Sequence, residues 1–105
     1  MVPVFDGHND VLLRLWGKKL GDPVAAFFKG EGEGHLDYPR MVRGGFAGGF
    51  FAIFVPSPQD EEFSDDEDLN PPTANEVGQF AALSATISMA SLLFRLEEAS
   101  QGRFR

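Results

Sequence analysis

Apolar residues in this chain form two short runs that lack the polar alternation of a half-buried strand. The first run covers residues 2 to 5 and predicts a strand near residues 2 to 6, and the second covers residues 46 to 55, broken only by Gly48 and Gly49. Such runs are typical of parallel strands that are covered on both faces. The two glycines indicate a bulge or a close backbone approach. Because helical sequence separates the runs, we expect two adjacent strands in parallel.

Helical spacing of apolar residues predicts the other elements. A helix is expected over residues 11 to 20, and Asp22-Pro23 starts a further short helical turn through residues 24–28. A long helix is predicted over residues 74–99, opened by a capping box in which Thr73 is the N-cap and Glu76 reaches back to it. The predicted inner face of this helix consists of Phe80, Leu83, Ile87, Ala90 and Phe94.

Composition and charge exclude several classes of site and partner. The 105 residues carry a net charge of −7 and include no cysteine. Disulfides and thiolate metal sites are therefore absent, and nucleic acid is not an expected partner, because phosphate binding needs a basic surface. Seven acidic residues fall within residues 57–72, where their mutual repulsion predicts a solvated loop. This segment lacks the glycine and the distal glutamate of a calcium-binding loop.

The longest uncharged stretch, residues 77 to 94, approaches the length of a membrane span. Its serine, threonine, glutamine and glycine residues make it too polar, so we predict a packed helix and no membrane segment. Met1 is followed directly by the first predicted strand, without the basic and apolar regions of a signal peptide. We therefore expect a cytoplasmic location.

Candidate metal chemistry follows the first strand, at His8 and Asp10. Residues two apart in an extended segment point the same way, so this imidazole and this carboxylate can converge on one cation. A histidine beside a turn is more often an ordinary surface residue, so the pair alone does not identify a metal site. Asp6 and Asn9 lie close enough to tune such a site, although turn chemistry explains both equally well.

A second His-x-Asp pair, His35 and Asp37, follows the glycine-rich residues 30–34 instead of a strand. We interpret this pair as structural. Asp37 is expected to cap a helical turn over residues 39–43, with Pro39 at its start.

Three blocks of sequence occur in order: residues 5–15 (FDGHNDVLLRL), residues 34–40 (GHLDYPR) and residues 44–56 (GGFAGGFFAIFVP). Together they resemble the N-terminus of the membrane (renal) dipeptidase family, peptidase family M19 of the amidohydrolase superfamily. The resemblance implies an α/β fold, the N-terminal portion of a (β/α)8 TIM barrel of the metal-dependent hydrolase type. Such barrels need about 250 residues. Residues 1–105 are therefore expected to be an N-terminal fragment of a single barrel domain, covering its first two β/α units.

The same resemblance implies a zinc-dependent dipeptidase that hydrolyses dipeptides with metal-activated water. It assigns His8 and Asp10 to one of two zinc ions and gives His35 no metal. A bridging glutamate, two later histidines and a late catalytic aspartate have no counterpart here, so no catalytic residue is assigned and the fragment is expected to be inactive. The full-length form is compatible with a homodimer. Two alternatives stay open: an amidohydrolase-type barrel that acts on another amide or ester, and a non-enzymatic acidic interaction module.

Overall fold

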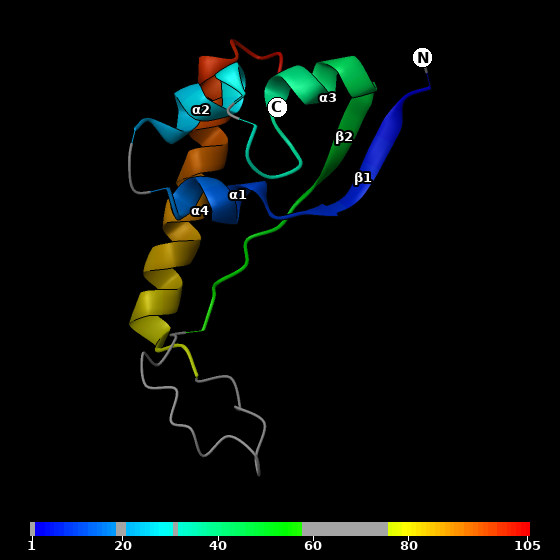
Figure 1. Ribbon diagram of the computed structural model, residues 1–105. Coiled ribbons are helices and arrows are strands. Elements are labelled where there is room, and N and C mark those ends of the chain that lie inside the picture. Colours follow the sequence, from blue (N-terminus) through cyan, green and yellow to red (C-terminus); the bar gives the residue numbers. More distant parts are fainter. Residues whose placement is uncertain (1, 19–20, 31, 58–75) are drawn as a thin grey trace, which may run out of the picture.

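The computed structural model describes residues 2–18, 21–30, 32–57 and 76–105. Helices separate and follow the two parallel strands of the described chain, which makes the fold α/β (Figure 1). In order, the elements are β1 (Val4–Asn9), α1 (Val11–Trp16), α2 (Pro23–Lys29), α3 (Tyr38–Gly44), β2 (Phe46–Phe51) and α4 (Gln79–Ala99).

The two strands pair in parallel, as the apolar runs predict. Val4 pairs with Phe46 while Phe5 pairs with Gly48, so β2 contains an irregularity at this point. A Cβ atom on Gly48 would lie 3.2 Å from the ring of Phe5, and one on Gly49 would lie 2.8 Å from the ring of Phe46. The bulge expected at these glycines is therefore confirmed, and neighbouring rings leave little room for a side chain at either position.

The bounds of both strands differ from the predicted ones. β1 continues to Asn9 instead of ending near residue 6, because its ladder with β2 persists to the pair formed by Asn9 and Phe51. β2 ends at Phe51 instead of residue 55, since β1 offers no partner beyond Asn9. As a consequence, His8 lies within the strand itself and Asp10 lies directly after it.

The first two helices follow the predicted order. α1 ends at Trp16, short of the predicted residue 20, where the N–H of Gly17 donates to Leu13 O over 2.9 Å. α2 begins at Pro23, as predicted, and the carboxylate of Asp22 accepts a hydrogen bond of 3.0 Å from the N–H of Val24.

The start predicted for the long helix is wrong. α4 begins at Gln79 instead of residue 74, with Gly78 at the N-cap and no side-chain cap bond, and Glu76 precedes the helix. The predicted N-cap Thr73 lies outside the described residues, as does most of the acidic segment 57–72.

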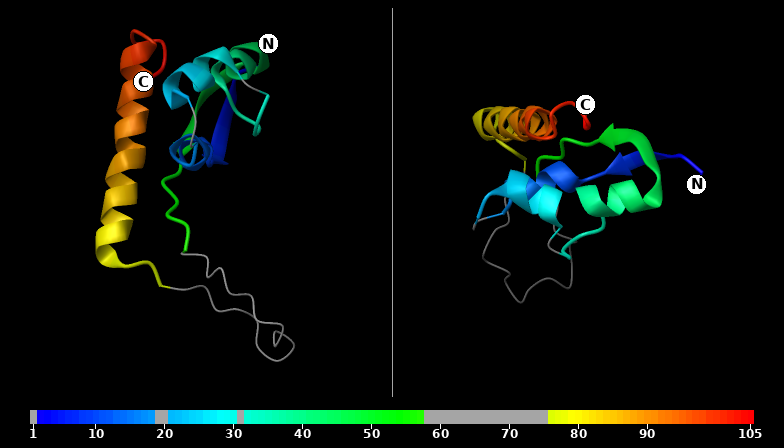
Figure 2. Two further views of the ribbon diagram at one scale, coloured as in Figure 1. Left: turned by 60° about the vertical axis from the view of Figure 1, so that its left-hand side comes forward. Right: turned by 90° about the horizontal axis from the view of Figure 1, so that it is seen from above.

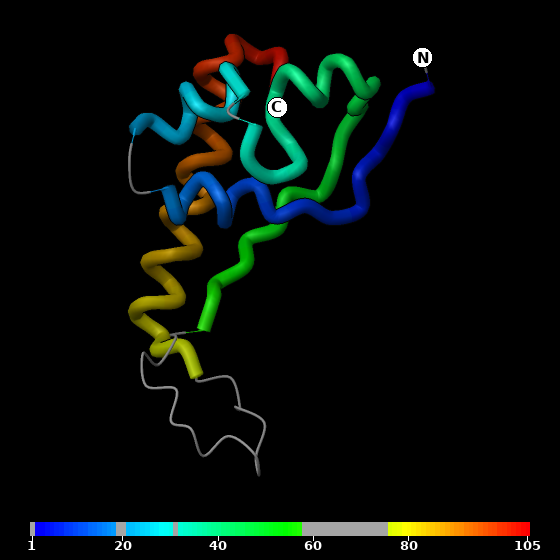
Figure 3. The backbone as a smooth tube through the Cα atoms, in the orientation of Figure 1, coloured from blue at the N-terminus to red at the C-terminus, as the bar shows by residue number. Residues whose placement is uncertain are grey.

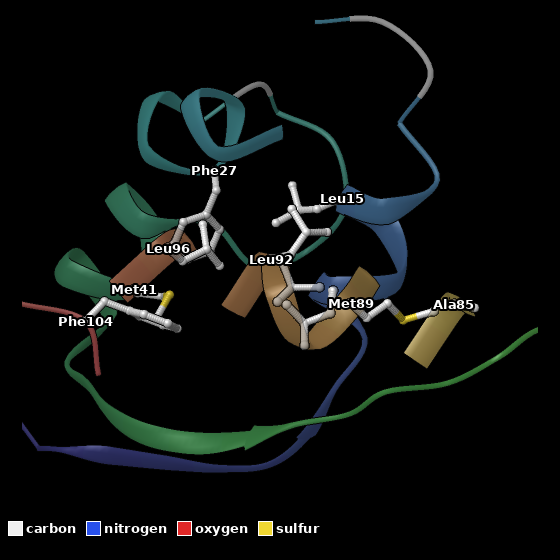
Figure 4. Close-up of a cluster of buried hydrophobic side chains, with 10 residues drawn as sticks. Leu15, Phe27, Met41, Ala85, Met89, Leu92, Leu96 and Phe104 are labelled. Atoms are coloured by element: carbon white, nitrogen blue, oxygen red, sulfur yellow. The ribbon is translucent and has the colours of Figure 1, made fainter. Parts of the chain in front are cut away.

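The hydrophobic core lies among the four helices, with the strands along one side (Figure 4). Figure 2 shows α4 as the longest helix, lying along one side of the molecule. α4 packs on α1 and α2, with Leu92 and Leu96 facing Leu15 and Phe27 (Figure 4). Phe27 is fully buried and makes an edge-to-face contact with Phe104, whose ring centroid lies 5.7 Å away.

The buried face of α4 is not the predicted one. Four predicted inner residues are exposed, namely Phe80 (86%), Leu83 (56%), Ile87 (60%) and Phe94 (68%), and Ala90 is half-buried. The side chains of α4 that are buried in the core are instead Ala85, Met89, Leu92 and Leu96. The helix is apolar on more than one face, so its pattern does not single out a stripe. Contact with α1 and α2 selects the face that is buried.

By length and composition alone, α4 could also cross a membrane, with a mean hydropathy of 1.3 over eighteen residues. Only 22% of that stretch is buried in the described structure. Its side chains nevertheless complete the core against two other helices, which favours the packed helix that the sequence predicts.

Candidate metal centre

His8 and Asp10 lie side by side at the C-terminal end of β1. His8 Nε2 lies 3.2 Å from Asp10 Oδ2, and the two side chains are 66% and 51% exposed. Two ligands of one tetrahedral zinc ion, each bonded at about 2.0–2.1 Å, are separated by about 3.3 Å. An imidazole nitrogen and a carboxylate oxygen are both common zinc ligands. The pair therefore has the donor types, the separation and the access expected of two ligands of one zinc ion.

The carboxylate of Asp10 is not used by the adjacent helix. Asp10 occupies the N-cap position of α1, where an aspartate ordinarily accepts a backbone hydrogen bond, yet its side chain makes no cap bond. The N–H of Val11 instead donates to Asn9 Oδ1 over 3.3 Å. Asp10 is thereby left to face His8.

Asp6 and Asn9 fix the backbone on both sides of His8. Asp6 Oδ1 accepts from the N–H of His8 at 3.2 Å, and Asp6 Oδ2 accepts from Asn9 Nδ2 at 3.0 Å. Within the described part of the chain, neither residue bonds to the side chain of His8 or Asp10. The geometry favours turn chemistry for both, and their effect on a metal stays a prediction.

Asp37 of the second His-x-Asp pair has the predicted capping role. Its carboxylate accepts from the backbone N–H of Arg40 at 2.9 Å and from Arg40 Nε at 2.8 Å, at the start of α3. Burial would raise the pKa of the Asp37 carboxyl. The two hydrogen bonds from Arg40, with the charges of Arg40 and Arg14, outweigh burial and hold this pKa below its ordinary value.

The loop before α3 is bound by two arginines. Arg14 of α1 donates to the carbonyl oxygens of Glu33 and of Leu36, the latter at 2.7 Å. Arg40 of α3 donates to the carbonyl oxygens of Glu33 and Gly34, each at 3.0 Å. We call residues 32–36 the clamped loop. In the backbone trace it returns from α2 towards the junction of β1 and α1 (Figure 3).

The clamped loop and the His8–Asp10 pair face one cavity of about 410 Å³. Its lining consists of Asp6, His8, Asn9, Asp10, Val11, Arg14, Gly34, His35 and Leu36. The sequence does not predict that His35 shares this cavity, and the repeated His-x-Asp motif is its only signal. Across the described ranges, no three His, Cys, Asp or Glu side chains are grouped to hold a metal, and the assignment of His35 outside the metal site stays a prediction.

Comparison with known proteins identifies the family. The family model of membrane dipeptidases, peptidase family M19, matches residues 1–105. The chain belongs to the membrane dipeptidase family. This confirms the resemblance carried by the three sequence blocks.

Two solved metallopeptidases have the same α/β fold over 97% of this chain. One, described as dipeptidase AC of family M19, is 46% identical with a TM-score of 0.78. The other, from Rhodobacter sphaeroides and liganded with a phosphinate mimic of the dipeptide L-Ala-D-Ala, is 45% identical with a TM-score of 0.79. An uncharacterised Acinetobacter calcoaceticus protein, from the 3′ region of PQQ-III, is 56% identical over 55 residues, which are 52% of this chain. The chain covers 29%, 30% and 18% of these three relatives, respectively.

Proposed function

We propose that this chain forms part of a zinc-dependent dipeptidase, which at the full length of the family hydrolyses the peptide bond of dipeptides. Family membership and two metallopeptidase structures with the same fold support this proposal. The observation that carries it is the His8–Asp10 pair, because the Asp10 carboxylate makes no cap bond to the helix that follows it and faces an imidazole at the separation of two zinc ligands.

The full-length fold that we propose is a (β/α)8 barrel that begins with β1. Its support is the parallel β1–β2 pair joined through helices, which is the repeating unit of that architecture. Active sites of these barrels lie at the C-terminal ends of the strands. His8 and Asp10 lie at that end of β1.

The proposed site contains two zinc ions, one of them held by His8 Nε2 and the Asp10 carboxylate. Bound zinc polarises a carbonyl and acidifies water, which supplies hydroxide at neutral pH. The hydrogen bonds of Asp6 and Asn9 keep the backbone around His8 in place, so the imidazole is presented at a fixed position. The other ligands and the proton-transfer group come from outside this chain, and residues 1–105 alone are inactive.

Hydrolysis assays on the full-length protein test this function. We expect turnover of dipeptides that is lost on chelation and restored by zinc. Turnover of lactones or cyclic ureas without dipeptides would reassign the reaction to another amidohydrolase class. Absence of any hydrolysis by the zinc-loaded protein would favour a non-enzymatic module. The cytoplasmic location and the homodimer stay predictions, to be measured by cell fractionation and by light scattering.

A further inference from the structure

An aspartate occupies the N-cap position of α1, of α2 and of α3, which allows a comparison within one chain. Asp22 and Asp37 have extended backbones, with ψ angles of 115° and 167°, and both carboxylates accept a backbone N–H of their helix. This is the usual conformation of a capping residue. Asp10 has a ψ of 31° and makes no side-chain cap bond. The unused cap at Asp10 thus coincides with a backbone conformation that the two capping aspartates do not adopt.

The side chain of Asn9 closes a turn around Asp10. Asn9 Oδ1 accepts the N–H of Val11 over 3.3 Å, so the hydrogen-bonded ring encloses the backbone of Asp10. Asparagine commonly bonds in this way to the backbone two residues on, and the bond restricts the dihedral angles of the residue between them. The Asn9 turn therefore accounts for the backbone conformation that sets Asp10 apart from Asp22 and Asp37.

Asn9 is itself held by both strands. Its Nδ2 donates to Asp6 Oδ2 at 3.0 Å, and its carbonyl oxygen accepts from the N–H of Ala52 at 3.0 Å, directly after β2. The residue is half-buried. An amide suits this position because one end must accept from Val11 while the other donates to a carboxylate. An aspartate here would place a second negative charge against Asp6.

We propose that Asn9 is a positioning residue, which keeps the carboxylate of Asp10 off α1 and available to a metal ion beside His8. Without the Asn9 turn, Asp10 could adopt the extended backbone of the other two aspartates and bond to the first turn of its own helix. That bond would compete with the metal for the carboxylate. His8 Nε2, which lies 3.2 Å from Asp10 Oδ2, would then lose its partner ligand. This inference rests on the proposed zinc-dependent function.

The zinc affinity of the full-length protein, measured by competition with a chromophoric chelator, tests this role. Asn9→Ala removes the turn, and we expect the affinity of one of the two zinc sites to fall roughly 10- to 100-fold. Asn9→Ser differs from Asn9→Ala by one hydroxyl, whose oxygen can close the same turn more weakly. It should recover part of the lost affinity. Equal zinc affinity of the serine and alanine variants would show that the turn does not position Asp10, and would overturn the inference.

Asp22→Ala is the matched control, because it removes the side-chain bond to the N–H of Val24 at the start of α2. It deprives a helix of one N-terminal hydrogen bond, as Asn9→Ala does, but it lies outside the cavity that His8 and Asp10 line. Its zinc affinity should stay within about twofold of wild type. A loss equal to that of Asn9→Ala would show a general effect of stability and would also overturn the inference.

The position of Asp10 provides a readout that needs neither zinc nor turnover. In a crystal structure of the zinc-free, full-length Asn9→Ala protein, we expect the Asp10 carboxylate to accept the N–H of Leu12 or Leu13. A carboxylate that still faces His8 would overturn the inference, even with a lowered zinc affinity. Asn9→Ser replaces Asn9→Ala if the alanine variant does not fold, and an affinity equal to that of wild type would then refute the role of Asn9.

The zinc measurements also separate this inference from the proposed function. A full-length protein that binds zinc with this dependence on Asn9 but cleaves no dipeptide would contradict the dipeptidase function alone. Unchanged zinc affinity of Asn9→Ala, in a protein that hydrolyses dipeptides, would contradict the role of Asn9 alone.

Discussion

Arg40 binds Asp37 twice, through its backbone N–H at 2.9 Å to Oδ1 and through Nε at 2.8 Å to Oδ2. The carboxylate is almost completely buried, with 4% of the residue exposed. One contact caps α3, and the other neutralises a charge that would be costly to bury alone. The start of α3 and the end of the clamped loop are thereby joined at one residue.

The substitution Asp37→Asn should make stability depend less on acid pH. A lowered pKa in the folded state stabilises the protein above the carboxyl pKa of the unfolded chain, and this stabilisation is lost as pH falls through the folded-state value. The amide that replaces the carboxylate keeps an acceptor for the cap but loses the ion pair. We expect this substitution to lower the free energy of unfolding by about 1–3 kcal/mol at neutral pH. In urea unfolding of the full-length protein, this difference should vanish below the lowered pKa.

Asp22→Asn is the matched control for that experiment. Asp22 also caps a helix, but its ion pair with Arg95 spans 3.7 Å between side chains that are 60% and 52% exposed. Such pairs contribute about 0–1 kcal/mol. The control substitution should therefore change the free energy of unfolding only slightly across the same pH range. An Asp37→Asn penalty that persists unchanged into acid would contradict the assignment of the stabilising charge to Asp37.

The two His-x-Asp pairs should respond differently to removal of their histidines. In the full-length protein, His8→Ala should lose one of two zinc ions and nearly all dipeptidase activity, since it removes a direct ligand. His35→Ala should keep both ions. Metal analysis by plasma mass spectrometry measures this directly. Loss of zinc from His35→Ala with retention by His8→Ala would show that the metal pair was chosen wrongly.

Gly49→Ala should weaken the pairing of the two strands. The added Cβ would lie 2.8 Å from the ring of Phe46 and 3.0 Å from Asp6 Cβ, so one of them must move. We expect the free energy of unfolding, measured with a chemical denaturant, to fall by about 1–3 kcal/mol. Gly7→Ala in β1 is the control, because its Cβ would meet nothing within 4 Å of the described residues. It should be neutral or slightly stabilising, and equal losses in the two variants would refute the steric argument.

Residues 1–105 produced alone should aggregate or remain molten. α4 exposes a row of large apolar side chains, among them Phe80 and Ile87, and the two-stranded sheet has open edges. Serine at both positions should reduce aggregation, measured by light scattering, without loss of helical circular dichroism. Serine at the buried Leu92 should instead lower the helical circular dichroism and leave the aggregation unrelieved. A sharp two-state melt from an unmodified monomer would contradict this prediction.

The local sequence was sufficient to predict those features of the structure that depend on one dominant interaction. The apolar runs predicted parallel pairing, because unalternated strands must be covered on both faces. Asp37 could be assigned as a helix cap because it precedes a proline in the first turn of its helix. His8 and Asp10 follow from strand geometry, which places residues two apart on one face.

The sequence did not predict the features that depend on contacts between residues far apart along the chain. The buried face of α4 depends on which helices it meets, and an evenly apolar helix carries no local signal for that choice. The position of His35 is set by side-chain bonds to backbone carbonyls, made by arginines that lie far from it along the chain or beyond a turn. Such bonds follow no periodic pattern, so the cavity shared by the two histidines became visible only in three dimensions.

The attachment of Arg14 has a consequence for the kinetics of ligand entry. Arg14 lies in α1, the helix that follows Asp10 directly, and its side chain is hydrogen-bonded to the loop that carries His35. Both sides of the cavity are therefore attached to one short helix, and we expect its width not to depend on a separate loop closure. Association at this face would then proceed as a single bimolecular step, with a rate set by encounter and orientation and no slow ordering phase before it.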